Sequence, residues 1–138
     1  MGSIMAIIDC LIFRHHQSHS HQIQRQCIAK YLNCKESAIH ISRIGKPILT
    51  SHPSTHFSVS HTNTYYFICF SNSPIGCDIE SKNRPISDRV LHRNNHTRHQ
   101  YPSNILAWTA WEATCKATGQ GLHFPIQPAS FSQSRSFL

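Results

Sequence analysis

Apolar residues near the start of the chain follow two patterns, one typical of a strand and one of a helix. Residues 4–13 form an apolar run interrupted by Asp9, which predicts a buried strand. The run is too short to span a bilayer, and it lacks the positive leader and small-residue cleavage site of a signal peptide. Residues 22–32 predict an amphipathic helix, because their apolar side chains recur at helical spacing: Ile23, Cys27, Ile28, Tyr31 and Leu32.

Further along the chain, apolar and polar positions alternate as expected for strands. The isoleucines at 39 and 41 predict a strand, and residues 57–60 and 65–70 predict a hairpin around a short polar turn. Residues 75–80 predict another strand whose apolar side faces the core. A helical pattern returns at 105–117, where Ile105, Leu106, Trp108, Ala113 and Ala117 are the spaced apolar positions.

Acidic residues are scarce, and three of the six fall in the last two of these segments. Asp78 and Glu80 are two positions apart, so in a strand they project from the same face. Two adjacent carboxylates repel each other unless a cation lies between them, and oxygen ligands with few protein contacts suit Mg2+. Glu112 and Lys116 share a helix face and could bind metal and anion together. The pattern predicts a divalent-metal site that also takes a phosphate, although each half alone also fits an ordinary strand end or an exposed helix pair.

Motifs at these positions occur in an order that points to one family. The chain has GKP at 45–47, FSVSH at 57–61, IGCDIE at 75–80, WTAWEATCK at 108–116 and GQGL at 119–122. This order resembles the 4'-phosphopantetheinyl transferase family, which has GKP, F-N-x-S-H, G-x-D-x-E and W-x-x-K-E-A-x-x-K with a G-x-G-L tail. The resemblance covers roughly residues 14–133 and is closest to the larger, pseudo-dimeric members of the surfactin-synthetase-activating type.

The resemblance implies an α+β fold of two similar halves, a Mg2+-dependent reaction and a cytoplasmic enzyme. The chain would form one domain, residues 1–138, with a first half at 1–72 and a shortened second half at 73–138. Such enzymes transfer the phosphopantetheine arm of coenzyme A to a serine of an acyl or peptidyl carrier protein, which is holo-acyl-carrier-protein synthase activity. The implied metal ligands are Asp78, Glu80 and Glu112, Lys116 would stabilise the leaving phosphate, and the implied coenzyme A contacts are Arg14, Lys46, Ser60, His61 and Lys116.

Several positions depart from the family pattern. Trp111 stands where the family has a lysine, and Ser58 where it has an asparagine. No carboxylate lies between Asp88 and Glu112 to act as the general base, so the prediction assigns this role to His99, because a histidine titrates near neutral pH. The family continues through further strands after the GQGL block, whereas the second half of this chain stops early, at Leu138. The shortened second half predicts a compact variant, a homo-oligomer that completes the sheet, or a decaying gene product.

Composition narrows the alternatives. The net charge of +7 fits an acidic carrier protein, and the scattered basic residues match no known nucleic-acid motif. The six cysteines form no C-x-x-C pair, which predicts free buried thiols in a reducing cytosol. Histidines at 15, 16, 19 and 21 invite a transition-metal interpretation but lack cysteine or carboxylate ligands at regular spacing. Two alternatives stay open: a catalytically impaired relative that binds coenzyme A or a carrier, and a basic His-rich module for metal or nucleic acid.

Overall fold

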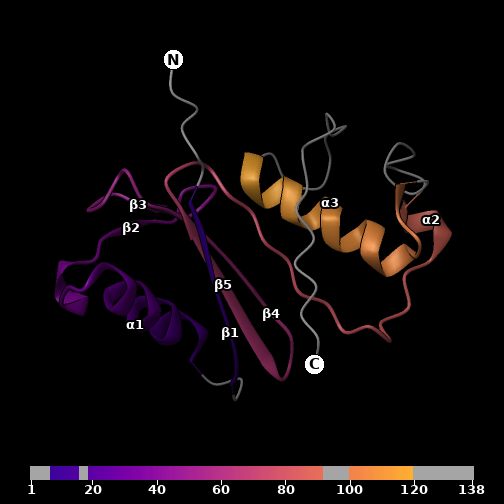
Figure 1. Ribbon diagram of the computed structural model, residues 1–138, viewed down its shortest axis with the longest axis horizontal. Helices are drawn as coiled ribbons and strands as arrows, with labels where there is room; N and C mark the ends of the chain where they lie inside the picture. Colours follow the sequence, from indigo (N-terminus) through magenta and orange to yellow (C-terminus); the bar gives the residue numbers. More distant parts are fainter. Residues whose placement is uncertain (1–6, 16–18, 92–99, 120–138) are drawn as a thin grey trace.

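The computed structural model describes residues 7–15, 19–91 and 100–119, and within them the fold mixes helices and strands, as the resemblance implies (Figure 1). The chain order is β1 (Ile8–Arg14), α1 (Ser20–Leu32), the short 3-10 helix η1 (Glu36–Ala38), β2 (Ile41–Ser42), β3 (Ile48–Leu49), β4 (His56–His61), β5 (Tyr65–Ser71), α2 (Asp88–Leu91) and α3 (Asn104–Thr118). None of the helices in these ranges is long and apolar enough to cross a membrane.

The main sheet is antiparallel with the order β1-β5-β4, so β5 is its central strand. The β4–β5 hairpin confirms the prediction made from the alternating pattern. Strands β2 and β3 pair separately as a short antiparallel ribbon. The register places Cys10 opposite Cys69 and Cys69 opposite Ser58, so these three residues lie in one row across the sheet.

Helix α1 covers one face of this sheet and forms the apolar core with it. Its residue Ile28 is fully buried, as are Tyr66 and Ile68 of β5. The helix ends where Asn33 adopts the left-handed conformation (φ 51°) and donates its N–H to Ala29 O and Lys30 O. The predicted helix at 22–32 is confirmed, and it begins two residues earlier than predicted, at Ser20.

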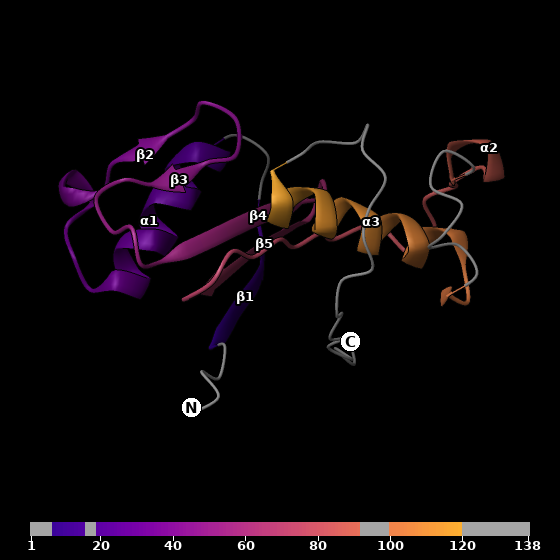
Figure 2. The same ribbon diagram turned by 90° about the horizontal axis from the view of Figure 1, so that it is seen from above.

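Helix α3 lies on the other side of the sheet, so that the strands run between α1 and α3 (Figures 1 and 2). The helix begins after Ser103, whose hydroxyl accepts a hydrogen bond from Leu106 N, and ends at Gly119, which has φ 72°. Its inner side is buried, with Trp111 at 3% exposure. The predicted helix at 105–117 is confirmed.

Two predicted features of the strands are wrong. The segment at 4–13 was expected to be buried, but β1 is an edge strand that leaves Ile8, Leu11 and Ile12 exposed at 53%, 46% and 45%. An apolar run does not distinguish a central strand from an edge strand, and this accounts for the error. Residues 75–80 form no strand at all, for a reason that lies in the neighbouring strand β4.

Candidate active site

Residues 75–80 are attached to β4 through serine side chains in place of a backbone ladder. Ser58 Oγ accepts a hydrogen bond from Cys77 N, and Ser60 Oγ accepts one from Ile79 N, both at 3.1 Å. Because these hydroxyls take the amides that a strand would pair with carbonyls, no strand forms here. The two carboxylates that follow these amides both contact α3, Asp78 through Lys116 and Glu80 through Trp108.

Gly76 lies at the closest approach between this segment and α3. A Cβ atom built there would be 1.9 Å from Ala113 O and 2.4 Å from Ala117 N. Lys46 ties the same contact together, since its Nζ donates to Ile75 O at 3.0 Å and to Ala117 O at 2.8 Å. Burial lowers the pKa of Lys46. The GKP lysine, predicted to bind phosphate, therefore links the two segments that carry the acidic residues.

An ion pair between Asp78 and Lys116 forms the centre of the site. Lys116 Nζ and Ser60 Oγ both donate to Asp78 Oδ1, each at 2.8 Å. The Asp78 side chain is only 4% exposed, and that of Lys116 is 32% exposed. The second oxygen, Asp78 Oδ2, is buried with no hydrogen-bond partner among the described residues. Such a carboxylate oxygen is costly to bury and is suited to receive a cation.

Glu80, in the segment before Arg84, contacts α3 nearer to the start of the helix than Asp78 does, and it has other partners. It forms an ion pair with Arg84 and accepts a hydrogen bond from Trp108 Nε1 at 3.2 Å. The Arg84 guanidinium carbon also lies 5.7 Å from the centre of the Trp108 ring. Arg84 and Trp108 were not predicted as site residues, and the sequence offers no spacing rule that pairs them with Glu80.

Glu112 lies on α3 one turn from Trp108 and one turn from Lys116, on the face that meets residues 78–80. Burial raises the pKa of Glu112, and so do the charges of Asp78 and Glu80, while Lys116 and Arg84 oppose the shift. The Glu112 carboxylate is therefore close enough to Asp78 and Glu80 for their charges to act on it. The structure brings together the acidic residues of two motifs that are far apart in the sequence.

The donor set fits a divalent cation through Asp78 and Glu112. Asp78 Oδ2 has no partner among the described residues, and burial raises the pKa of Glu112 with a contribution from the Asp78 charge, as expected for two members of an oxygen-ligand site. Within the described ranges, no three His, Cys, Asp or Glu side chains are grouped closely enough to form a metal site. Glu80 would first have to leave Arg84 and Trp108 before it could join the other two.

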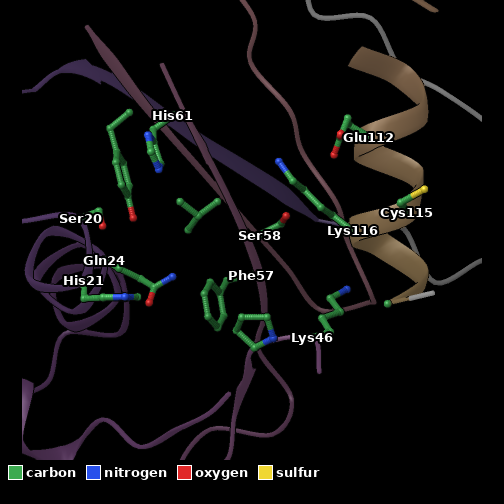
Figure 3. Close-up of a pocket in the computed structure, with 14 residues that line it drawn as sticks. Ser20, His21, Gln24, Lys46, Phe57, Ser58, His61, Glu112, Cys115 and Lys116 are labelled. Carbon is green, nitrogen blue, oxygen red and sulfur yellow. The ribbon is translucent and has the colours of Figure 1, made fainter. Parts of the chain in front are cut away.

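A cavity of about 430 Å³ opens beside this cluster, along β4 (Figure 3). Lys116 and Glu112 border it from α3, and His61 borders it at the end of β4. Its lining also includes Lys46 and the first turns of α1, which contribute Ser20, His21 and Gln24. These three α1 residues were not predicted, except that His21 belongs to the histidine cluster. The cavity thus joins four of the predicted site residues in one space: Lys46, His61, Glu112 and Lys116.

The remaining predicted residues lie in different surroundings. Ser60 is buried and bonded to Asp78, as described above. Arg14 does not line the cavity; its guanidinium carbon lies 5.9 Å from the centre of the Tyr65 ring. His99 lies outside the described residues, so its role as the base stays a prediction. Trp111 packs edge-on against Trp108 with ring centres 5.1 Å apart, so the family's lysine position faces the interior in this chain.

Comparison with known proteins confirms the resemblance found in the motifs. The chain is 32% identical over 123 residues to the 4'-phosphopantetheinyl transferase Sfp of Bacillus subtilis (strain 168), a match that covers 78% of this chain and 53% of that protein. It is 31% identical over 112 residues to the 4'-phosphopantetheinyl transferase ffp of Bacillus subtilis, covering 73% of this chain and 49% of that protein. It is 30% identical over 92 residues to the 4'-phosphopantetheinyl transferase gsp of Aneurinibacillus migulanus, covering 59% and 38%.

The chain spans about half the length of the first two of these curated relatives and less of the third. No family model matches the chain.

Proposed function

We propose that this chain, a relative of the 4'-phosphopantetheinyl transferases, transfers the phosphopantetheine arm of coenzyme A to a serine of an acyl or peptidyl carrier protein with the help of Mg2+. The observation that carries the proposal is the buried Asp78 carboxylate, which pairs with the half-buried Lys116 beside the cavity and keeps Oδ2 without a partner among the described residues. A buried carboxylate with a spare oxygen is costly to maintain unless the site binds a cation or a hydrogen-bond donor.

The chain's own residues can be given roles from their contacts. Asp78 and Glu112 would hold Mg2+, with Glu80 as a third ligand once it leaves Arg84. When bound, this ion would neutralise charge on the pyrophosphate of coenzyme A. Lys116 would donate to the leaving phosphate, because its ammonium borders the cavity and is already held in place by Asp78. His61 is the exposed end of β4 and would contact the nucleotide phosphates.

Two predicted coenzyme A contacts receive a different proposed role. Lys46 and Ser60 are engaged by Ala117 O and Asp78, respectively, so we propose that they position the site. The general base stays assigned to His99. All six cysteines are free, which supports a reducing compartment such as the cytoplasm.

Intact-mass spectrometry of apo carrier proteins tests the proposal. Carriers are incubated with the full chain, coenzyme A and Mg2+, with and without a chelator. A chelator-sensitive gain equal to the phosphopantetheine arm is expected for the wild type, and its loss is expected for Asp78→Asn and Glu112→Gln. A folded Lys35→Gln variant is the matched control, because Lys35 is exposed and does not line the cavity.

No gain from a folded wild-type chain, on any carrier of the panel, would overturn the proposed transfer. Calorimetry with coenzyme A then separates the alternatives, because a catalytically impaired relative would still bind it. A basic His-rich module would instead bind DNA or RNA with a steep dependence on salt.

We also propose that residues 1–72 and 73–138 correspond to the two halves implied by the resemblance. All strands of the main sheet belong to the first range, and α2 and α3 belong to the second. Hydrogen exchange of the full chain tests this division. Amides of α3 should open at a lower free energy than those of β5, and a single common opening would contradict two units.

The exposed edge of β1 supports an oligomer, which sedimentation velocity would detect.

A further inference from the structure

Three cysteine thiols lie close together on the α3 side of the sheet. Cys10 of β1 is opposite Cys69 of β5, and Cys69 is opposite Ser58 of β4. Opposed residues of antiparallel strands share a face, with Cβ atoms about 4.5–5.5 Å apart. Cys77 reaches the same place from residues 75–80, because its thiol donates to Ser58 O at 3.2 Å. The three cysteines therefore lie in a row that runs from β1 across β5 to the segment that carries Asp78.

The two inner thiols share one hydrogen-bond acceptor. Cys69 Sγ donates to Ser58 O at 3.7 Å, and Cys77 Sγ donates to the same oxygen at 3.2 Å. The common acceptor holds the two sulfurs next to each other. Both residues are shielded from solvent, at 1% and 5% exposure, whereas Cys10 is exposed. The buried pair thus has a neighbour that solvent reaches.

We propose that Cys10, Cys69 and Cys77 form a thiol relay that ends in a disulfide between Cys69 and Cys77 when the chain meets a small peroxide. The Cys10 sulfur would take one peroxide oxygen, giving a sulfenic acid and one water. The Cys69 sulfur then attacks the sulfenic sulfur, which forms the Cys10–Cys69 disulfide and releases a second water. Finally, the Cys77 sulfur attacks the Cys69 sulfur, the Cys10–Cys69 bond breaks, and the proton lost by Cys77 passes to the departing Cys10 sulfur.

The consequence is a covalent link between β5 and the residue that precedes Asp78. In the reduced chain, this segment is held to β4 by hydrogen bonds from Cys77 and Ile79. Oxidation removes the two thiol hydrogens donated to Ser58 O and replaces them with a bond between the sulfurs. The inference rests on the placement of the cysteines and holds whether or not the chain is a transferase.

Peptide mapping of the wild-type full chain tests the relay. The folded chain is treated with hydrogen peroxide, free thiols are blocked, and the sample is digested without reductant. Cleavage after Phe70 separates Cys69 from Cys77. The expected product is a pair of peptides joined through Cys69 and Cys77 and released by dithiothreitol. Complete blocking of both thiols after peroxide, with Cys10 alone oxidised, would overturn the proposal.

Variants then test the order of the steps. Cys77→Ala should trap the Cys10–Cys69 disulfide, since the last exchange has no attacking thiol. Cys10→Ser should slow formation of the Cys69–Cys77 bridge by about tenfold, as expected when the exposed thiol is the point of entry. Cys34→Ser is the matched control, because Cys34 packs against the core on the α1 side. An unchanged rate of Cys69–Cys77 disulfide formation in folded Cys10→Ser would overturn the relay. Where a variant fails to fold, the wild-type peptide map still shows whether the Cys69–Cys77 disulfide forms.

Discussion

The two faces of the central sheet are held by different forces. On the α1 side, Ile28, Tyr66 and Ile68 are fully buried and pack as hydrocarbon and aromatic surface. On the α3 side, apolar residues such as Trp111 are also buried, but the contacts with β4 and residues 75–80 include hydroxyls, thiols, carbonyls and the Asp78–Lys116 ion pair. Apolar burial is non-directional and stabilises whatever packs densely, whereas polar contacts fix orientation at a modest net gain. The α1 face therefore provides stability, and the α3 face positions the charged groups.

The largest expected effect comes from the apolar face. Ile68→Ala should lower the free energy of unfolding by about 2–5 kcal/mol, because it removes fully buried methyl groups and leaves a cavity. Urea unfolding followed by circular dichroism measures the change. Leu106→Ala, at a site that is 41% exposed on α3, should stay within about 0.5 kcal/mol of wild type. Equal losses in the two variants would contradict the placement of the core.

A smaller effect, confined to the α3 face, is expected at Gly76. Gly76→Ala places a Cβ against the backbone of Ala113 and Ala117, and it should cost about 1–3 kcal/mol as α3 moves away. Both tryptophans of the chain lie in α3, so their fluorescence reports this movement. Gly45→Ala is the matched control. This substitution should also lower stability, because Gly45 has a positive φ of 74°, but a Cβ atom added there meets no other residue within 4 Å. The tryptophan spectrum of this variant should therefore not change.

Removing a serine contact should lower the free energy of unfolding by less than Gly76→Ala does. Ser60→Ala removes a donor to Asp78 and an acceptor for Ile79 N, and it should cost about 1–2 kcal/mol. Ser54→Ala, at an exposed position, serves as the control in the same urea titrations. A neutral Ser60→Ala would mean that the segment at 75–80 is held to β4 by packing alone.

The smallest expected effect is a change in the free energy of unfolding with pH that is due to Lys46. Its pKa in the folded chain is lowered by burial, so between this pKa and the ordinary value of 10.5 the unfolded chain binds more protons. Stability attributable to Lys46 should therefore rise with pH across this window. Comparing the wild type with Lys46→Met from pH 8 to 11 isolates the effect from the titrating cysteines. Parallel curves would show that the Lys46 ammonium has the same pKa in both states.

The elements with strong periodicity were predictable from the sequence, and those defined by side-chain contacts were not. Helices α1 and α3 and the β4–β5 hairpin follow from apolar spacing that one buried face dictates. The segment at 75–80 alternates like a strand, but Ser58 and Ser60 take its amides, and no pattern of letters reveals a hydroxyl acting as a backbone acceptor. The exposure of β1 was also hidden, since position within a sheet depends on tertiary pairing.

The sequence motifs named residues that are near one another in the fold, but they did not reveal the contacts of these residues. Asp78 pairs with Lys116, and its charge acts on Glu112. That Lys46 bonds to Ile75 O and Ala117 O could not be read from a GKP turn, because these partners come from segments remote in the sequence. Whether the assigned residues bind metal and coenzyme A stays a prediction until the transfer experiment is done.

The exposed strand β1 has a consequence for how the purified chain should behave in storage. An edge strand with apolar side chains on both faces, and with no strand of the described ranges paired to its outer edge, offers a template for pairing between molecules. What opposes such pairing is mutual repulsion arising from the net charge of +7. Salt screens that repulsion over roughly 10 Å at 0.1 M. Concentrated samples should therefore turn turbid sooner in high salt than in low salt, and a lysine in place of Ile12 should delay the clouding.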